Sequence, residues 1–294
     1  MANPAPNNVA GRHCPVCNEA LPPHLPPNRC PHCLLRAGLE TQPEAVGGET
    51  VVVLHPPASP VFPQPGESFG HYQIVRLLGE GGMGAVFEAE DLESSRRVAL
   101  KVLGHRLDSP EARSRFFREG RLAASVNHPN SVYVYGTEEI AGVPVIAMEL
   151  VGGGTLQGRV SRHGPLPVAE AVDSGFQIIA GLEAAQRLGV LHRDIKPSNC
   201  FVDTDGTMKI GDFGLSISTF VRTEPVITAT GTFLGTPAFS SPEQLRGDEM
   251  TVRSDLYSLG VTLYYLLTGH QPFEAVDMVR LLATVLEKRA ESPA

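Results

Sequence analysis

Beyond residue 68, apolar positions occur in short alternating runs and at longer helical spacings, which predicts a domain of mixed strands and helices. We expect strands at residues 72–78, 86–89, 98–102 and 208–210. Residues 109–125 predict a helix with Phe116, Phe117 and Leu122 on its apolar side. A second helix, ending near Gly189, is predicted by the spacing of Val168, Val172, Phe176, Ile179 and Leu182.

The longest apolar run and the overall composition exclude several classes of protein. Residues 256–269 are interrupted by polar and glycine positions and fall short of the roughly 18 apolar residues of a membrane span, so we expect a buried helix there. With 24 Lys and Arg against 32 Asp and Glu, the net charge is −8, which argues against a nucleic-acid-binding protein. Residues 1–11 lack the basic and apolar regions of a secretory signal, so a cytoplasmic location is expected.

Cysteine and proline divide the chain into three zones. Four of the 5 Cys lie in the first 33 residues, and 14 of the 25 Pro lie in the first 66. We therefore expect a Cys-rich head at residues 12–38, a linker rich in Pro and Gly at 39–67, and a globular body at 68–294. Proline removes backbone donors and stiffens the chain, so the linker is expected to be extended rather than packed.

The head contains two Cys-x-x-Cys pairs with the spacing of a zinc site. The four residues are Cys14, Cys17, Cys30 and Cys33. A two-residue spacer lets both thiolates of a pair reach one tetrahedral ion, and the second pair completes a four-sulfur site. Two disulfides or a redox pair are the alternatives, but cytoplasmic disulfides are uncommon and no βαβ pattern surrounds either pair. The segment resembles a zinc ribbon, and we expect it to bind a structural Zn²⁺. The ribbon would either dock a protein or have a purely structural role.

A glycine-rich motif joins the first two predicted strands. It comprises Gly79, Glu80, Gly81, Gly82, Met83, Gly84, Ala85 and Val86. Strands on both sides suit a hairpin that covers phosphates, whereas a dinucleotide-binding fold would need a helix directly after the glycines. Because glycine has no Cβ atom, its backbone N–H group can closely approach phosphate oxygens.

A lysine follows inside the apolar strand 98–102. Lys101 lies 22 residues after Gly79, and its burial would require an anionic partner. Glu119, in the predicted helix that follows, could pair with Lys101 and aim the amine at the α- and β-phosphates.

Two acidic motifs come after the second predicted helix. Residues 192–199 read His-Arg-Asp-Ile-Lys-Pro-Ser-Asn, and Asp212 opens the sequence Asp-Phe-Gly. Phosphoryl transfer needs metal ions that bridge phosphates, a cation on the transferring group and a carboxylate near the attacking hydroxyl. Asp212 and Asn199 supply oxygen ligands for Mg²⁺. Asp194 supplies the base, and Lys196 supplies the cation.

Together these motifs have the order and spacing of the eukaryotic-like protein kinases, and from about Phe69 onward the chain most resembles the bacterial serine/threonine kinases. The resemblance implies an α+β, bilobal protein-kinase fold. Its β-rich N-lobe would span 68–150 and its helical C-lobe 151–294, preceded by the small zinc ribbon. It also implies ATP, with Mg²⁺ or in its place Mn²⁺, and transfer of the γ-phosphate to Ser or Thr hydroxyls of proteins.

The resemblance assigns further roles to single residues. Gly79, Gly81 and Gly84 would cover the nucleotide, and Leu78 and Val86 would contact its adenine. Ala99 and Phe201 would lie on the two faces of the adenine ring. Met148 would be the gatekeeper, and Glu149 to Val151 the hinge at the adenine edge. Lys101 and Glu119 would form the ion pair of the active state. Lys196 indicates a Ser/Thr kinase, Thr236 would touch the loop that carries Asp194, and Asp255 would anchor the backbone of that loop. Thr228, Thr230 and Thr232 are candidates for autophosphorylation, which self-association would permit.

The chain also departs from the family pattern. Gly120 lies beside Glu119 in a predicted helix, where glycine costs about 1 kcal/mol relative to alanine, and we expect it to loosen that helix. The family continues beyond the position of Ala294 and supplies an Arg that pairs with the equivalent of Glu243. We therefore expect a C-lobe that is incomplete in this sequence.

Other functions compete with a protein kinase. A pseudokinase or adaptor would bind nucleotide or partners through the kinase fold and the zinc head without catalysis, but every residue of the chemistry is present. A small-molecule phosphotransferase is disfavoured by Thr236-Pro237 and by Ser241-Pro242-Glu243, which indicate a peptide-docking groove. We expect protein substrates with Ser or Thr and no nucleic-acid partner.

Overall fold

The computed structural model describes residues 62–81, 84–104, 107, 109–213, 237–275 and 278–293. Several sequence-based predictions lie outside these residues: the zinc ligands Cys14, Cys17, Cys30 and Cys33, the loop residues Gly82 and Met83, and Thr228, Thr230, Thr232 and Thr236. Among the described residues, no helix is long and apolar enough to cross a membrane.

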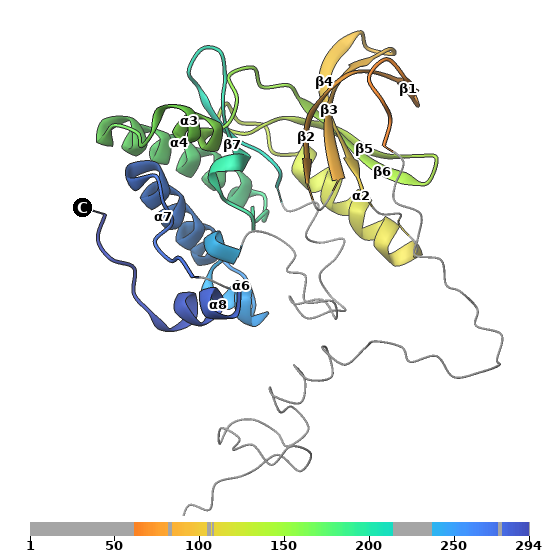
Figure 1. The fold of residues 1–294 in the computed structure, drawn as a ribbon. Helices are drawn as coiled ribbons and strands as arrows, with labels where there is room; N and C mark the ends of the chain where they lie inside the picture. The colour runs from red at the N-terminus through yellow and green to blue at the C-terminus, as the bar shows by residue number, and fades with distance from the viewer. Residues whose placement is uncertain are drawn as a thin grey trace, which may run out of the picture. The chain divides into compact units, whose positions relative to one another are not determined.

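The N-terminal part is a six-stranded antiparallel sheet with one helix (Figure 1). Its strands are β1 (Ser68–Phe69), β2 (Tyr72–Gly81), β3 (Gly84–Asp91), β4 (Arg96–Leu103), β5 (Val134–Ile140) and β6 (Val143–Glu149), in the spatial order β1-β2-β3-β4-β6-β5. The predicted strands are confirmed, and β2 continues through the first glycines of the loop. The register opposes Val86 to Lys101 and Ala99 to Met148, which places all four along the centre of the sheet.

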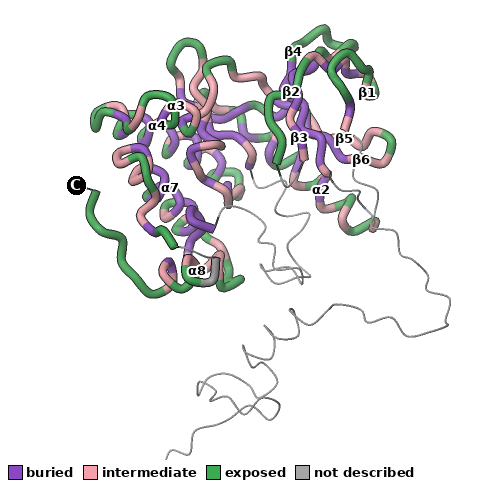
Figure 2. Tube along the Cα trace, in the orientation of Figure 1, coloured by how far each residue is buried: buried purple, intermediate pink, exposed green. Residues whose placement is uncertain are grey.

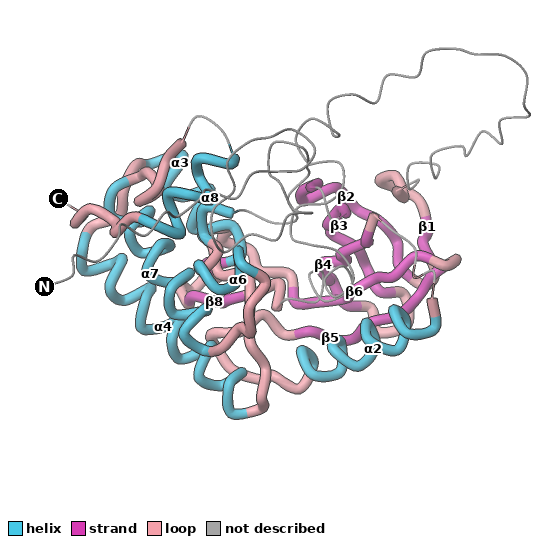
Figure 3. Tube along the Cα trace, turned by 90° about the horizontal axis from the view of Figure 1, so that it is seen from below, coloured by secondary structure: helices cyan, strands magenta, loops and turns pink. Residues whose placement is uncertain are grey.

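Helix α2 (Pro110–Ala124) packs beside β5 (Figure 3). The Ser109 hydroxyl caps it by accepting from the Ala112 N–H at 3.1 Å, and Pro110 suits the first turn, where its missing donor is not needed. Phe116 is fully buried, as expected for the apolar side, but Leu122 is exposed. That side is completed by Gly120 and Ala123, because the helix approaches the sheet through small residues.

The C-terminal part is helical. Its elements are α3 (Leu156–His163), α4 (Val168–Arg187), the 3-10 turn η1 (Pro197–Asn199), the hairpin of β7 (Cys200–Val202) and β8 (Met208–Ile210), the 3-10 turn η2 (Pro237–Phe239), α6 (Pro242–Arg246), α7 (Val252–Thr268) and α8 (Met278–Glu287). The buried helix predicted at 256–269 is α7, which begins earlier at a Thr251 capping box and ends at Gly269 in the left-handed conformation. The structure thus confirms a sheet-rich and a helical part, while the incomplete C-lobe and the zinc ribbon stay predictions.

Among the described residues, the two largest apolar clusters hold most of these elements together. The larger one links the sheet and α2 to the helical part through Leu103, Phe116, Ile146, Ile178 and Ile210, among others. The smaller one covers the opposite face of the sheet around Ile74, Phe87 and Leu100, and Phe62 from the predicted linker packs against it. In Figure 2 the buried stretches follow the central strands and the inner sides of the helices. Because the larger cluster spans both parts, it fixes the elements on either side of the site described below.

Helix α4 buries only Leu182 of the five apolar residues whose spacing predicted it. Val168 and Phe176 are 68 % and 67 % exposed, and Val172 and Ile179 are also exposed. The buried positions are mostly small, including Ala171, Gly175, Gly181 and Ala185. A Cβ atom at Gly181 would lie 2.5 Å from the Asn130 carbonyl oxygen, so the helix meets its neighbours too closely for large side chains. The spacing therefore predicted the helix correctly but not its buried side.

The structure also changes the role expected for Gly120. A Cβ atom there would lie 2.3 Å from Oγ1 and 2.4 Å from Cγ2 of Thr137. Glycine is therefore needed for the packing of α2 on β5, and it does not simply loosen the helix.

We expect Gly120→Ala to lower the free energy of unfolding by about 1–3 kcal/mol, because overpacking outweighs the gain in helix propensity. Urea or thermal unfolding measures the change. Gly158→Ala in α3 is the matched control: its Cβ would meet nothing closer than 3.4 Å, so this change should stabilise by up to about 1 kcal/mol. Thr137→Ala should recover part of the loss in Gly120→Ala. Stabilisation by Gly120→Ala would contradict the packing argument.

Candidate active site

The loop 192–199 is anchored by a buried carboxylate at the start of α7. Asp255 is 4 % exposed. Its Oδ2 accepts the His192 N–H at 2.9 Å, and its Oδ1 accepts the Arg193 N–H at 2.7 Å. Arg193 has a φ of 68°, a conformation that non-glycine residues adopt only where the surroundings impose it. The predicted anchoring role of Asp255 is therefore confirmed.

His192 connects this loop to the Asp-Phe-Gly segment. Its ring is fully buried, accepts the Asp194 N–H at Nδ1 at 3.3 Å, and places Nε2 2.9 Å from the Gly211 carbonyl oxygen. The ring also lies 4.7 Å from that of Phe213. Burial lowers the pKa of His192 and outweighs the opposing attraction of Asp255 and Asp194. A neutral ring with its proton on Nε2 satisfies both contacts. His192 thus positions the two acidic segments, a role that the sequence analysis did not assign to it.

Asp194 is held by two predicted site residues. Its Oδ2 lies 2.8 Å from Lys196 Nζ and accepts from Asn199 Nδ2 at 3.0 Å. The Asn199 amide also donates to the Asp194 carbonyl oxygen at 2.8 Å, and η1 directs it back toward the loop. The Asp194 side chain is 19 % exposed, so these contacts do not enclose it completely.

A second carboxylate meets a lysine from the sheet. Lys101 is 8 % exposed, and its Nζ lies 2.8 Å from Asp212 Oδ1. Burial alone would raise the pKa of Asp212, but the Lys101 charge and hydrogen bond outweigh it and hold that pKa below its ordinary value. Asp212 has a φ of 62°, and the Gly211 N–H before it donates to the Asn199 carbonyl oxygen at 2.9 Å. The structure thus brings the segments of Asp194, Asn199 and Asp212 together.

The anion that Lys101 contacts is Asp212, whereas the sequence suggested Glu119. Glu119 in α2 lies 3.9 Å from Arg118. A pair between Lys101 and Glu119 stays a prediction for another state of the protein.

Next to Asp212 lies a pocket of about 230 Å³ with mainly apolar walls. Nine predicted residues line it: Leu78, Gly79, Val86, Ala99, Met148, Glu149, Val151, Phe201 and Asp212. The pocket is also lined by Leu150, which belongs to the predicted hinge, and by Val132 and Ser198, which the sequence did not single out. Ser198 is a sequence neighbour of predicted residues, but Val132 lies in a segment without a motif and only the fold brings it there.

The remaining described residues of the glycine motif shape the hairpin without lining this pocket. Glu80, Gly81, Gly84 and Ala85 belong to β2 and β3. At Gly84 φ is +140°, and a Cβ atom would lie 2.1 Å from the Val102 carbonyl oxygen, so only glycine fits.

The donor set suits a cation that completes its coordination with other oxygens. Among the residues with described positions, no group of three or more His, Cys, Asp or Glu side chains could hold a metal ion by itself. Asp212 offers carboxylate oxygens and Asn199 an amide oxygen. Mg²⁺ is usually bound through one or two protein carboxylates together with waters and substrate phosphates, so this sparse set fits Mg²⁺.

Ser254 fills a role that the sequence left open. Its hydroxyl donates to Glu243 Oε1 at 2.6 Å, and Gln244 of the same helix α6 donates to the Arg193 carbonyl oxygen at 2.9 Å. Burial would raise the pKa of Glu243, but the hydrogen bond from Ser254 and further contacts lower it. Helix α6 is thereby fastened both to α7 and to the loop of Asp194.

Comparisons with known proteins agree with this geometry. The protein kinase domain family matches residues 72–291. The chain is 39% identical over 236 residues to serine/threonine-protein kinase PknD of Mycobacterium tuberculosis, covering 80% of this chain and 35% of that one. It is 40% identical over 227 residues to serine/threonine-protein kinase PrkC of Bacillus subtilis, covering 76% of this chain and 34% of that one. The chain thus spans about a third of the length of these relatives.

A solved structure shows the same fold. The crystal structure of the Mycobacterium tuberculosis PknI kinase domain, C20A mutant, matches with a TM-score of 0.60 at 28% sequence identity, covering 72% of this chain and 80% of that one. The fold, the anchored loop and the matched sequence lead to one conclusion: this chain belongs to the protein kinase domain family.

Proposed function

We propose that the chain is an ATP-dependent protein serine/threonine kinase. The observation that carries this proposal is the contact of Asp194 with Lys196 and Asn199, together with a pocket that is lined in part by Ser198 and Asp212. Asp212 in turn is the ion-pair partner of Lys101. That arrangement combines a carboxylate, a cation and an apolar pocket, as phosphoryl transfer from a nucleotide requires. The sequence relatives, named serine/threonine-protein kinases, support the same activity.

In this proposal ATP lies in the pocket. The adenine would be enclosed by Ala99 and Phe201, with Leu78 and Val86 above it and the backbone of Glu149 to Val151 at its edge. The glycine hairpin would cover the phosphates. Lys101, paired with Asp212 here, is positioned to contact the phosphates and to pair with Glu119 in an active state.

The chemistry divides among three side chains. The hydroxyl oxygen of a substrate Ser or Thr attacks the γ-phosphorus, the bond to the ADP oxygen breaks, and the hydroxyl proton passes to Asp194. Lys196 is placed to stabilise charge on the transferring group, since its ammonium already contacts Asp194. Mg²⁺, or Mn²⁺ in its place, would be held by Asp212 and Asn199 and would neutralise phosphate charge.

Asp194→Asn should lower kcat for phosphorylation of a generic Ser/Thr protein substrate by about 10²–10⁴-fold, because it removes the proton acceptor. Lys101→Met should abolish measurable activity as well. Phosphate transfer from radiolabelled ATP measures both, and circular dichroism checks that each variant is folded. Arg187→Met, at an exposed ion pair on α4, is the control and should keep full activity. A folded wild-type chain that binds ATP without transferring phosphate would indicate a pseudokinase or adaptor.

We further propose that the kinase phosphorylates itself on Thr228, Thr230 or Thr232, with self-association bringing two copies together. A phosphate adds about −1.5 to −2 charges, which an arginine such as Arg193 could bind. Intact-mass analysis after incubation with Mg-ATP should show added phosphate on the segment between Asp212 and Glu243, and Asp194→Asn should show none. Absence of phosphate on the wild-type segment would rule this out.

We also propose that Cys14, Cys17, Cys30 and Cys33 bind one structural Zn²⁺ in a ribbon at residues 12–38, joined to the kinase domain 68–294 by the linker 39–67. The support is the spacing of the two Cys-x-x-Cys pairs. Elemental analysis should find about one zinc per chain, and Cys14→Ser together with Cys30→Ser should remove it. Cys200→Ser is the control, because this buried thiol lies in β7. Disulfide bonds found by mass spectrometry without zinc would contradict the proposal.

The remaining partners follow from this activity. We propose that the substrates are proteins with Ser or Thr and that the chain acts in the cytoplasm. The net charge of −8 is consistent with the expectation of no nucleic-acid partner.

A further inference from the structure

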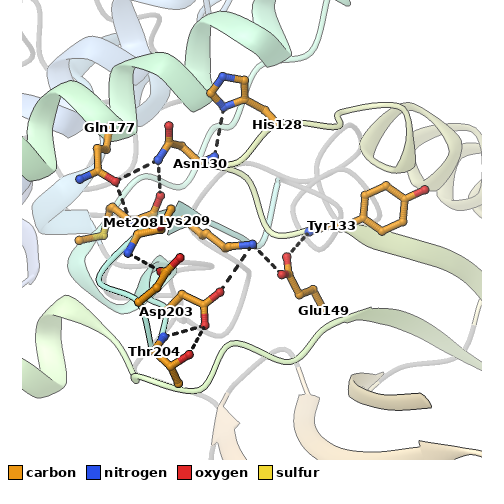
Figure 4. Close-up of polar contacts among 11 residues, drawn as sticks. His128, Asn130, Tyr133, Glu149, Gln177, Asp203, Thr204, Met208 and Lys209 are labelled. Carbon is orange, nitrogen blue, oxygen red and sulfur yellow. Dashed lines mark hydrogen bonds and ion pairs between the residues drawn. The ribbon is translucent and has the colours of Figure 1, made fainter. Parts of the chain in front are cut away.

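A polar cluster joins the hinge residue Glu149 to the β7–β8 hairpin (Figure 4). At its centre is Lys209 of β8, whose strand neighbours Met208 and Ile210 are buried in the core. Lys209 Nζ lies 2.6 Å from Glu149 Oε1 and 3.8 Å from Asp203 Oδ2. The side chains of Lys209 and Glu149 are 13 % and 25 % exposed, so this ion pair is far less solvated than a surface pair.

Glu149 also binds the start of β5. Its other carboxylate oxygen, Oε2, accepts the Tyr133 N–H at 3.2 Å, and its own N–H donates to the Tyr133 carbonyl oxygen at 2.8 Å. One side chain at the end of β6 is thus fixed to two separate segments. Loss of Lys209 would leave the Glu149 carboxylate partly buried without its cation.

The strand that carries Lys209 is itself firmly placed. The Ile210 N–H donates to the Asn130 carbonyl oxygen at 3.0 Å, and the Val132 N–H donates to the Ile210 carbonyl oxygen at 2.8 Å. Asn130 Nδ2 donates to the Met208 carbonyl oxygen at 2.7 Å, and Gln177 of α4 accepts from the Met208 N–H at 2.8 Å. The backbone of β8 is therefore held in place by these hydrogen bonds, and the Lys209 side chain extends from it to Glu149 of the hinge.

One of the two carboxylates that Lys209 contacts, that of Glu149, belongs to a residue that lines the pocket. Glu149 lines it together with Leu150 and Val151, which continue the hinge. Phe201, the floor of the pocket, is the cross-strand partner of Lys209 in the β7–β8 hairpin. Cross-strand partners point to the same face of a sheet, so the Lys209 stem lies beside this ring. Lys209 itself does not line the pocket, so it can influence a ligand only through these neighbours.

We propose that Lys209 is a positioning residue for nucleotide binding: its ion pair with Glu149 fixes the hinge backbone against which the adenine edge binds. The proposal rests on the proposed kinase function. The competing explanation is that the pair only stabilises the fold. A fixed hinge lowers the cost of ordering the site when ATP binds, so loss of the pair should act on affinity more than on the chemical step.

The experiment measures the Kd of Mg-ATP by calorimetry, together with KM for ATP and kcat, on the full chain. Lys209→Met removes the charge and keeps an unbranched side chain, Lys209→Arg retains the charge, and Glu149→Gln keeps an acceptor for the Tyr133 N–H. Lys209→Met combined with Glu149→Gln completes a double-mutant cycle. Arg187→Met is the control, because it breaks a pair with Glu183 at 3.0 Å that is exposed on α4.

We expect Lys209→Met to raise Kd and KM about tenfold while kcat at saturating ATP stays within about twofold. Glu149→Gln should raise Kd and KM by a similar factor, and the double variant should raise them no further than either single variant. Lys209→Arg should have a Kd and a KM within about threefold of the wild-type values. Arg187→Met should change nothing. If Lys209→Met does not fold, Glu149→Gln alone decides the question.

Three results would overturn the proposal. Unchanged Kd and KM in Lys209→Met would exclude a role in nucleotide binding. Additive losses in the double variant would show that the two residues act separately, and a lower melting temperature with unchanged Kd would show a purely structural pair. These outcomes differ from failure of the proposed function, in which the wild-type chain itself would bind no Mg-ATP.

Discussion

A buried carboxylate, that of Asp255, holds the loop that carries Asp194, and the rest of the site depends on this contact. Burying a charge is costly unless hydrogen bonds replace its water, and here the N–H groups of His192 and Arg193 do so. Asp255 also lies in the first turn of α7, where the helix dipole favours a negative charge. The anchored backbone forces Arg193 into its positive φ and turns Asp194 toward Lys196 and Asn199.

His192 connects this anchored loop to the segment of the second carboxylate, Asp212. Its neutral, buried ring accepts from the Asp194 N–H and contacts the Gly211 carbonyl oxygen, so the two acidic segments cannot shift independently. The sheet then contributes Lys101 to Asp212. The walls of the pocket come from the sheet, from the hinge and from the β7–β8 hairpin. All three pack against the larger apolar cluster.

At the hinge, too, one residue connects several segments. Glu149 is bound through its side chain to β8 and through its backbone to Tyr133, so the strand before Asp212 and the edge of the pocket form one connected unit. A nucleotide that binds there meets a rim already ordered by the protein. Gln177 of the helical part and Asn130, in the loop before β5, supply this order through hydrogen bonds to the backbone of Met208.

The sequence by itself predicted the strands β2, β3, β4 and β8 and the helices α2, α4 and α7, because alternation and helical period are properties of neighbouring residues. It did not predict β1, β5, β6 and β7 or α3, α6 and α8. Most of the residues that line the pocket were named by the resemblance to protein kinases, which rests on motif spacing. It also indicated Asp255 correctly, since that residue lies in a recognisable motif. Only the tertiary structure decided which face α4 buries, why Gly120 must be glycine, that Lys101 contacts Asp212, and that Val132 and Lys209 belong to the surroundings of the pocket. These features depend on how closely segments distant in sequence approach one another, and such distances are set by packing and not by local pattern.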